Sequence, residues 1–355
     1  MHRIITVLVA ATTAMRSGGA WSSGANSYTA TFARHETFHP RYGWLKKGVD
    51  LVDHDPVAFA SDDVHMNLGV GKNMAHAIRY WCEAFGLIVP LPSSPASGGG
   101  AEGGGGHTKR ALHQLTHAAR DLIAGAQALD PYIESTATLW WLHYQLLKTE
   151  KATTWNFAID HFGRTTFTAD ELEHDLRAYV RSHYSDHKIA DSSLAKDVHL
   201  FLRMYAFDES STFSEDSIDS PFIELGLLQK RGKEYTFVIG AKPTLPDAII
   251  AAACLDYAGV TLSPSKRDAH TGSKSISFTQ LMQGDLSPVK AFRLTENSLY
   301  EALERTLTPG PSPAGRGEKD LYLSDTAGVK QLAFKSDPLK LAHKLLKGVY
   351  RHALS

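Results

Sequence analysis

The residues His35, Glu36 and His39 have the types and spacing of a zinc-peptidase motif, His-Glu-x-x-His. In such an enzyme both histidines lie on one helical turn and hold the metal, while the glutamate activates the metal-bound water. Pro40 follows the second histidine directly, and the residue before a proline is displaced from helical geometry. No third histidine follows at the spacing of the extended motif. Zinc proteolysis is therefore one alternative, and loop histidines that make structural hydrogen bonds are another.

A third interpretation places the same residues on a phosphodiester. His35, Glu36 and His39 would then form an acid–base or divalent-metal cluster, with the metal unspecified. Arg34 and Arg41 flank this cluster and would stabilise the negative charge of the phosphate. This hypothesis makes all five residues candidate catalytic residues.

A helix is predicted from Lys72 to Phe85, and Gly86 ends it. Its apolar residues recur at helical spacing on one face. The opposite face carries Lys72, Asn73, His76 and Arg79, which are side chains suited to base edges and phosphates. Solvated helix faces have a similar composition, so the pattern permits DNA recognition without establishing it.

Basic residues recur at three further places. Lys196 and Arg203 share the polar face of a second predicted helix, and a predicted β-hairpin around Gly232 has a basic tip. The polar-aromatic segment near the N-terminus adds a lysine pair. The predicted DNA contacts are thus Lys46, Lys47, Lys72, Asn73, His76, Arg79, Lys196, Arg203, Lys230, Arg231 and Lys233.

The elements that must position these residues follow the order helix, Gly-Leu turn and basic hairpin, which is typical of a winged helix. Phe85-Gly-Leu-Ile88 repeats the pattern of Leu225-Gly-Leu-Leu228, which suggests two such units. We predict an α+β, predominantly helical fold with tandem winged-helix-like units and small β-hairpins. The predicted organisation is a disordered leader (1–27), an N-terminal winged-helix-like DNA-binding block (28–90), a Gly-rich linker or insertion (91–129), a second winged-helix-like domain (130–240) and a C-terminal helical domain (241–355) with a Pro/Gly insertion at 307–318.

Composition limits the class of protein. The net charge is −1 and 43% of the residues are hydrophobic, which excludes a uniformly basic coat but permits a local basic face. Cys82 and Cys254 are the only cysteines and form no metal or disulfide motif, so we expect a cytoplasmic protein. No apolar stretch is long enough to cross a bilayer, and no membrane partner is expected. The leader is open to three interpretations: a weak secretory signal, a disordered segment or a misassigned start.

Several stretches together resemble a known bacterial family. They include the dense segment 32–48, Leu68-Gly-Val-Gly-Lys-Asn-Met74, Lys242-Pro-Thr-Leu-Pro246 and Asp325-Thr-Ala-Gly328. The chain is similar here to the SspB-like family of formerly uncharacterised proteins, which are encoded in DNA phosphorothioation and phage-defence clusters. The Gly-rich linker, the Pro/Gly insertion and the extra N-terminus depart from the family pattern.

The resemblance implies a function and partners. Family members are encoded beside proteins similar to phosphoadenosine-phosphosulfate reductase, a cysteine desulfurase and an ATPase. DNA binding and nicking of one strand are ascribed to the SspB-like component. We therefore expect double-stranded DNA and the sulfurtransferase-like and ATPase components as partners, with a divalent metal if the chain cuts DNA. A non-enzymatic DNA-binding subunit or regulator is the alternative, and the zinc peptidase is the second alternative.

Overall fold

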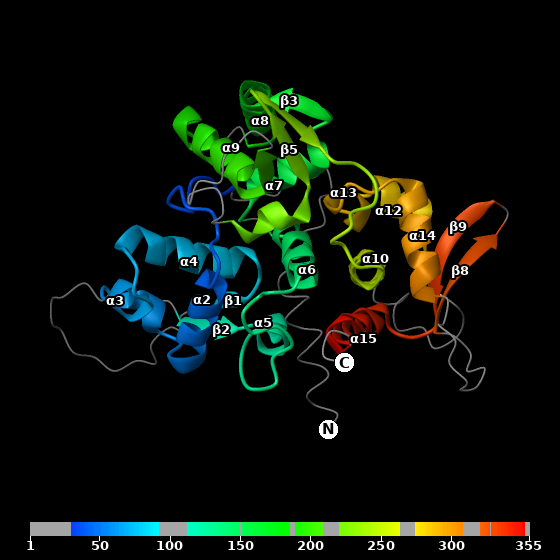
Figure 1. Ribbon diagram of the computed structural model, residues 1–355, viewed down its shortest axis with the longest axis horizontal. Coiled ribbons are helices and arrows are strands. Elements are labelled where there is room, and N and C mark those ends of the chain that lie inside the picture. The colour runs from blue at the N-terminus through cyan, green and yellow to red at the C-terminus, as the bar shows by residue number, and fades with distance from the viewer. Residues whose placement is uncertain are drawn as a thin grey trace, which may run out of the picture.

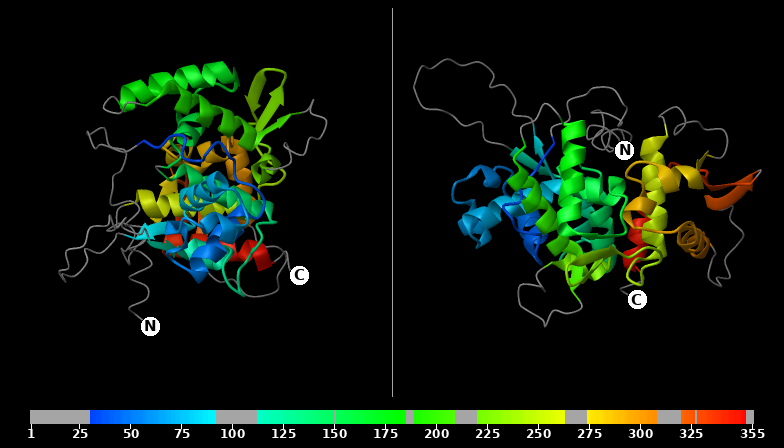
Figure 2. Two further views of the ribbon diagram at one scale, coloured as in Figure 1. Left: turned by 90° about the vertical axis from the view of Figure 1, so that its left-hand side faces the viewer. Right: turned by 90° about the horizontal axis from the view of Figure 1, so that it is seen from above.

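The computed structural model describes residues 30–91, 112–149, 151–184, 189–208, 220–262, 274–307, 320–326 and 328–351. Helices predominate and the strands form small separate sheets, which confirms the predicted α+β class. Three groups of elements surround the central helix α6 (Thr136–Leu147) (Figure 1). Seen from above, the middle group separates the N-terminal group from the C-terminal group (Figure 2).

The N-terminal unit is three α-helices and one short 3-10 turn, followed by a β-hairpin. Its elements are α2 (Trp44–His54), η1 (Ala58–Ala60), α3 (Val64–Leu68), α4 (Lys72–Ala84), β1 (Ile88–Leu91) and β2 (Leu112–Leu115). Helix α4 begins at Lys72 as predicted and ends at Ala84, one residue before the predicted end, and Gly86 has a positive φ of 67° just after it. Gly48 of α2 lies directly against Cys82 of α4, where any larger side chain would collide. This close approach lets α2 and α4 share one core.

The strands β1 and β2 pair antiparallel, from Ile88 opposite Leu115 to Leu91 opposite Leu112. The predicted linker therefore differs from the structure at its C-terminal end, because β2 and helix α5 (His117–Leu122) lie within it. Because a long Gly-rich stretch separates β2 from β1, the sequence has no short turn between two strand patterns that would predict this hairpin. The intervening residues 92–111 lie outside the described part of the chain.

The second unit combines a helical segment, a strand, two helices and a hairpin. Its elements are α7 (Thr153–Asn156), the π-helical turn η2 (Phe157–His161), β3 (Thr166–Thr168), α8 (Ala169–His183), α9 (Asp191–Tyr205), β4 (Ala206–Asp208), η4 (Pro221–Leu225), β5 (Leu228–Arg231) and β6 (Glu234–Phe237). The strand order is β3-β6-β5-β4, with β4 parallel to β5. The predicted capping box of Thr168 and Glu171 begins α8, and Gly232 has the positive φ that the hairpin turn needs.

The C-terminal group packs around the buried helix α10 (Asp247–Thr261). Its other elements are β7 (Lys274–Ser277), α12 (Phe278–Gln283), α13 (Pro288–Ala291), α14 (Glu296–Leu307), β8 (Leu321–Thr326), β9 (Val329–Phe334) and α15 (Pro338–Arg351). The strand order is β7-β9-β8. The predicted leader 1–27 lies outside the described residues, as does the Pro/Gly insertion except for Leu307, the last residue of α14. No helix among the described residues is long and apolar enough to cross a membrane.

Candidate nucleic-acid interface

The His35 loop, which we define as residues 30–43, is not helical. Ala33, Glu36 and Thr37 have positive φ angles of 52°, 50° and 65°, so the backbone turns sharply around His35. The carbonyl of His35 accepts a hydrogen bond from the Phe38 N–H at 2.9 Å. The sequence match to His-Glu-x-x-His therefore lacks the helical turn that a zinc peptidase requires. This agrees with the helix-disrupting effect expected of Pro40.

The His35 side chain is 1% exposed and is held from both ring nitrogens. Its Nδ1 accepts the Thr37 N–H at 3.1 Å, so the proton is on Nε2 and is donated to Asp197 Oδ1 at 2.8 Å. The same carboxylate accepts the Ala33 N–H at 2.8 Å and the Thr154 hydroxyl at 2.9 Å. Aromatic rings of α4 and α7 surround the imidazole. His35 and Asp197 thus form a buried clamp that ties the loop to α9.

The five candidate catalytic residues are not gathered around one accessible point. His35 and His39 are buried, Glu36 is half-buried, and Arg34 is exposed. The Arg41 guanidinium lies 5.7 Å from the Trp44 ring centroid, which places it against an aromatic residue of α2. Among the described residues no cluster of three or more His, Cys, Asp or Glu side chains is arranged to hold a metal. The loop is better suited to positioning than to acid–base chemistry.

Helix α4 presents Lys72, Asn73 and His76 to solvent, as predicted. Arg79 is half-exposed, and its Nε lies 4.0 Å from Glu83 Oε1 one turn later. Burial raises the pKa of Glu83, but hydrogen bonds from His113 and Lys151 outweigh it and the net pKa is lowered. Glu83 is therefore a carboxylate that partly compensates the charge of Arg79.

The lysine pair on α2 is held by neighbouring groups of the fold. Lys46 forms an ion pair with Asp50 one turn along the helix, and its Nζ lies 5.8 Å from the Tyr132 ring centroid. Lys47 donates to the carbonyl of Leu68 at 3.0 Å. Both lysines thus have structural partners.

Helix α9 differs from α2 in the state of its cations. Lys196, His199 and Arg203 are exposed and recur at helical spacing along one face. No ion pair between described residues involves Lys196 or Arg203. We call Lys196, His199 and Arg203 the α9 stripe. Its two cations, Lys196 and Arg203, have no ion-pair partner among the described residues.

The hairpin β5–β6 carries the predicted basic tip, but its three cations are not equivalent. Lys230 Nζ lies 2.7 Å from Asp208 of β4, and this hydrogen bond raises the lysine pKa. Arg231 and Lys233 flank Gly232 at the exposed turn. Lys230 is therefore a strand-to-strand tie, and the other two form the accessible tip.

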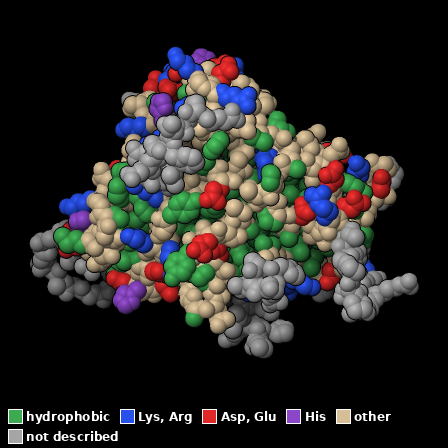
Figure 3. All heavy atoms as spheres, viewed as in Figure 1, with side chains coloured by type: hydrophobic (Ala, Val, Ile, Leu, Met, Phe, Trp, Pro, Cys, Tyr) green, Lys and Arg blue, Asp and Glu red, His purple; other side chains and the backbone are tan. Residues whose placement is uncertain are grey.

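The His35 loop lies between α4 and α9 (Figure 1). Trp81 of α4 donates its indole N–H to the Phe38 carbonyl at 2.8 Å, and Asp197 of α9 holds Ala33 and His35. Exposed Arg34 sits between these two clamped residues, while exposed Lys196 precedes Asp197. The clamp therefore holds the backbone on both sides of Arg34 close to Asp197 of α9. Lys and Arg side chains are seen over α8 and α9 and at the outer edge near the start of α4, with acidic side chains among them (Figure 3).

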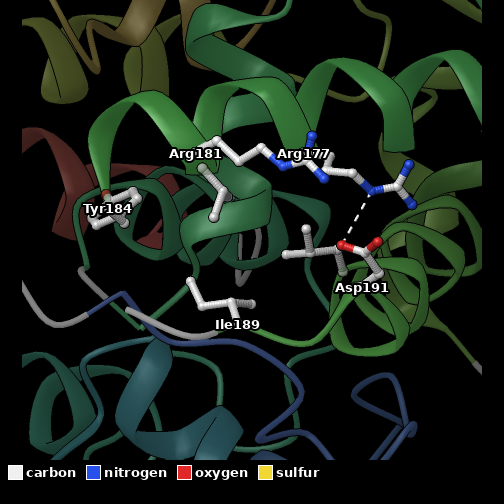
Figure 4. A pocket seen from close by; sticks show the side chains of 7 residues that line it. Arg177, Arg181, Tyr184, Ile189 and Asp191 are labelled. Carbon is white, nitrogen blue, oxygen red and sulfur yellow. Dashed lines mark ion pairs between the residues drawn. The ribbon is translucent and has the colours of Figure 1, made fainter. Parts of the chain in front are cut away.

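A surface pocket opens where α8 ends and α9 begins (Figure 4). Arg177 Nε lies 3.2 Å from Asp191 Oδ1, and Arg177 also donates to Glu173 at 2.6 Å. Arg181 lies one turn later and is exposed. The charge of Arg177 is thus satisfied internally, which leaves Arg181 as the accessible cation of the rim. The pocket lining is Arg177, Val180, Arg181, Tyr184, Ile189, Asp191 and Leu194.

Sequence reasoning missed Asp197 and Arg181. Asp197 is an acidic residue between the buried residues Leu194, Val198 and Phe201 of α9, and an acid on an apolar stripe is the signal that could have revealed it. Arg177 and Arg181 are like charges at i and i+4, which destabilise an isolated helix and so suggest an anionic partner or a local acid.

The chain matches one protein family and two solved structures. Residues 32–350 match the family described as a protein of unknown function, DUF4007. A solved structure described as magnesium ion-bound SspB is 33% identical, with a TM-score of 0.77 over 92% of this chain and 90% of that one. A second SspB structure is 32% identical, with a TM-score of 0.75 over the same shares of both chains. No curated protein matches the sequence significantly.

Proposed function

Because the chain belongs to the DUF4007 family and is a relative of SspB, we propose that it is the DNA-binding component of a DNA phosphorothioation and phage-defence system. The observation that carries the proposal is the α9 stripe, whose cations have no acidic partner among the described residues. An uncompensated row of cations on one helix face is suited to a polyanion. The sulfurtransferase-like and ATPase components of such a system are the proposed protein partners.

The element order supports duplex DNA as the ligand. In the second unit a strand, two helices and a hairpin follow one another with the strand order β3-β6-β5. We infer that this is a winged helix, in which α9 enters the major groove and the β5–β6 tip contacts the backbone. The N-terminal unit has the same order of α3, α4 and hairpin, which makes α4 a second candidate helix.

The proposed DNA-contacting residues have different roles. Arg203 is a side chain that can bind a guanine edge, whereas Lys196, Arg34 and Lys233 suit phosphates. Arg181 extends the phosphate track across the α8–α9 junction. The clamp of His35 and Asp197 acts indirectly, because it fixes the backbone on both sides of Arg34.

Strand nicking is the second part of the proposal. The solved relative that is described as magnesium ion-bound favours it, because enzymes that cut phosphodiesters commonly use such a cation. His35 is an unsuitable acid or base for this reaction, since its side chain is 1% exposed and both its nitrogens are engaged. The zinc-peptidase alternative is not carried forward, because its helix is absent.

The direct test measures the affinity for duplex DNA of wild type and Arg203→Ala. We expect the variant to bind about tenfold to a hundredfold more weakly. Arg305→Ala is the matched control, because Arg305 is also exposed but is paired with Asp247 at 2.7 Å on α10. Equal affinities of Arg203→Ala and wild type would contradict the proposed role of α9.

A further inference from the structure

The surface pocket between the end of α8 and the start of α9 has aliphatic faces (Figure 4). Its volume is about 210 Å³, below the roughly 300–1,000 Å³ of pockets for drug-sized ligands, so one ring system or one side chain suits it by size. Val180 and Leu194 are 5% and 2% exposed and form the apolar wall between the two helices. Half-buried Ile189 lies across the pocket from α8. A flat apolar group can therefore lie between these side chains.

Polar groups lie at the edges of this pocket. Tyr184 is at one end and Asp191 at the other, and the Arg181 side chain runs between them along α8 (Figure 4). Asp191 Oδ1 is 3.2 Å from Arg177 Nε, whereas its Oδ2 has no hydrogen-bond partner among the described residues. Arg181 is exposed and pairs with no acidic residue of the described chain. The pocket thus offers a hydrogen-bond acceptor at one end and a guanidinium at its rim.

This set of groups suits one nucleobase. A base has two flat faces that stack on apolar, aromatic or guanidinium groups, and an edge of hydrogen-bond donors and acceptors. A carboxylate can accept from the exocyclic amine of cytosine. The phosphate of the same nucleotide stays outside the pocket, where an arginine can bind it. An apolar peptide side chain also fits by size, but it leaves the Asp191 carboxylate without a donor, so the base is the better ligand.

The pocket lies at the start of α9 but on another side of the helix from the α9 stripe. Lys196 follows Asp191 by five residues, which is about 7.5 Å along the helix axis and roughly 140° around it. A base that stays paired in a duplex along the stripe therefore cannot enter the pocket. A base without a pairing partner can turn out of the stack at low cost. The geometry thus favours an extruded base over a paired one.

We propose that this pocket receives one unpaired base of a DNA strand bound along α9, and that it prefers a base with an amino group, such as cytosine. Asp191 accepts the hydrogen bond of the amine, and Arg181 binds the adjacent phosphate. The proposal rests on the proposed DNA-binding function for the source of the base. It adds to that function a preference for DNA with an unpaired nucleotide.

The test measures the affinity of each protein for two duplexes that differ only in one unpaired cytosine. We expect wild type to bind the duplex with the unpaired base about tenfold more tightly, because stacking in the pocket adds to the phosphate contacts. Ile189→Trp fills the pocket and should reduce this ratio to about one. Val329→Trp, at an exposed β-branched residue of β9, is the matched control and should keep the wild-type ratio. Equal affinities of wild type for the two duplexes, or an unchanged ratio in Ile189→Trp, would overturn the proposal.

Asp191→Asn is the second variant, because Asp191 is 62% exposed and its substitution leaves the core intact. Wild type should prefer an unpaired cytosine over an unpaired thymine by about fivefold or more. Asp191→Asn should lose this preference, because the amide can donate to thymine O4 as well as accept from the cytosine amine. The same preference in wild type and Asp191→Asn would contradict the assigned role of the carboxylate.

Free dCMP separates the two possible sources of the base. Binding of dCMP to wild type should be far weaker than binding of the duplex with the unpaired cytosine, because the α9 stripe holds only the strand. Equal affinities for the two ligands would assign the pocket to free nucleotides and overturn the proposal. Absence of binding to both duplexes would instead contradict DNA binding itself, so failure of the pocket and failure of the proposed function are distinguishable.

Discussion

The two helix–hairpin units carry similar basic residues but compensate them differently. In the N-terminal unit Lys46 is paired with Asp50, Lys47 donates to a carbonyl, and Arg79 lies near Glu83. In the second unit Lys196 and Arg203 have no acidic partner among the described residues. These three cations of the N-terminal unit therefore serve mainly structure, whereas Lys196 and Arg203 remain available for a ligand. Counting cations in a sequence cannot separate these cases.

The largest expected effect comes from breaking the clamp that joins the two regions. Asp197→Ala leaves His35, the Ala33 N–H and the Thr154 hydroxyl without their common acceptor. We expect a loss of about 3–5 kcal/mol in the free energy of unfolding, because buried polar partners are orphaned. Denaturant unfolding measures this change.

Asp191→Asn on the same helix is the control for Asp197→Ala. Asp191 is 62% exposed and pairs with Arg177, so its substitution should cost less than about 1 kcal/mol. If Asp197→Ala were as mild as this control, the clamp would not be what holds the loop to α9.

Local sequence patterns predicted much of this arrangement. The capping box of Thr168 and Glu171, the turn at Gly232 and the start of α4 depend on neighbouring residues, and each is present. The clamp was not predicted because His35 and Asp197 are 162 positions apart, and only the tertiary fold brings them together. The pairings of Lys47 with Leu68 and of Lys230 with Asp208 were missed for the same reason.

A second prediction concerns the end of α9, where Tyr205 contacts buried His143. The His143 Nε2 lies 2.9 Å from the Ala291 carbonyl, so Nε2 carries the proton and Nδ1 accepts from the Tyr205 hydroxyl at 2.8 Å. Burial lowers the His143 pKa to about 4, with the nearby positive charges of Arg293 and Lys242 also lowering it. The folded state thus favours the neutral imidazole.

Because the unfolded histidine has the higher pKa, acid favours unfolding. The contribution of His143 is fully present above about pH 6.5 and is lost as the pH falls toward 4, for a total of about 3 kcal/mol. Denaturant unfolding across this range should show the decline, and His143→Gln should have a flatter profile. Identical pH profiles of the two proteins would contradict the assignment.

The most direct test of the contrast between the units is the salt dependence of duplex DNA binding. Each cation that contacts a phosphate contributes about 0.9 to the slope of log affinity against log salt concentration. We predict that Lys196→Ala with Arg203→Ala lowers the magnitude of this slope by about 1–2 and weakens binding. Lys46→Ala with Lys47→Ala, which removes the same number of positive charges from α2, should change it by less than about half a unit. Equal slopes for the two double variants would contradict the claim that α9 is the helix that binds DNA.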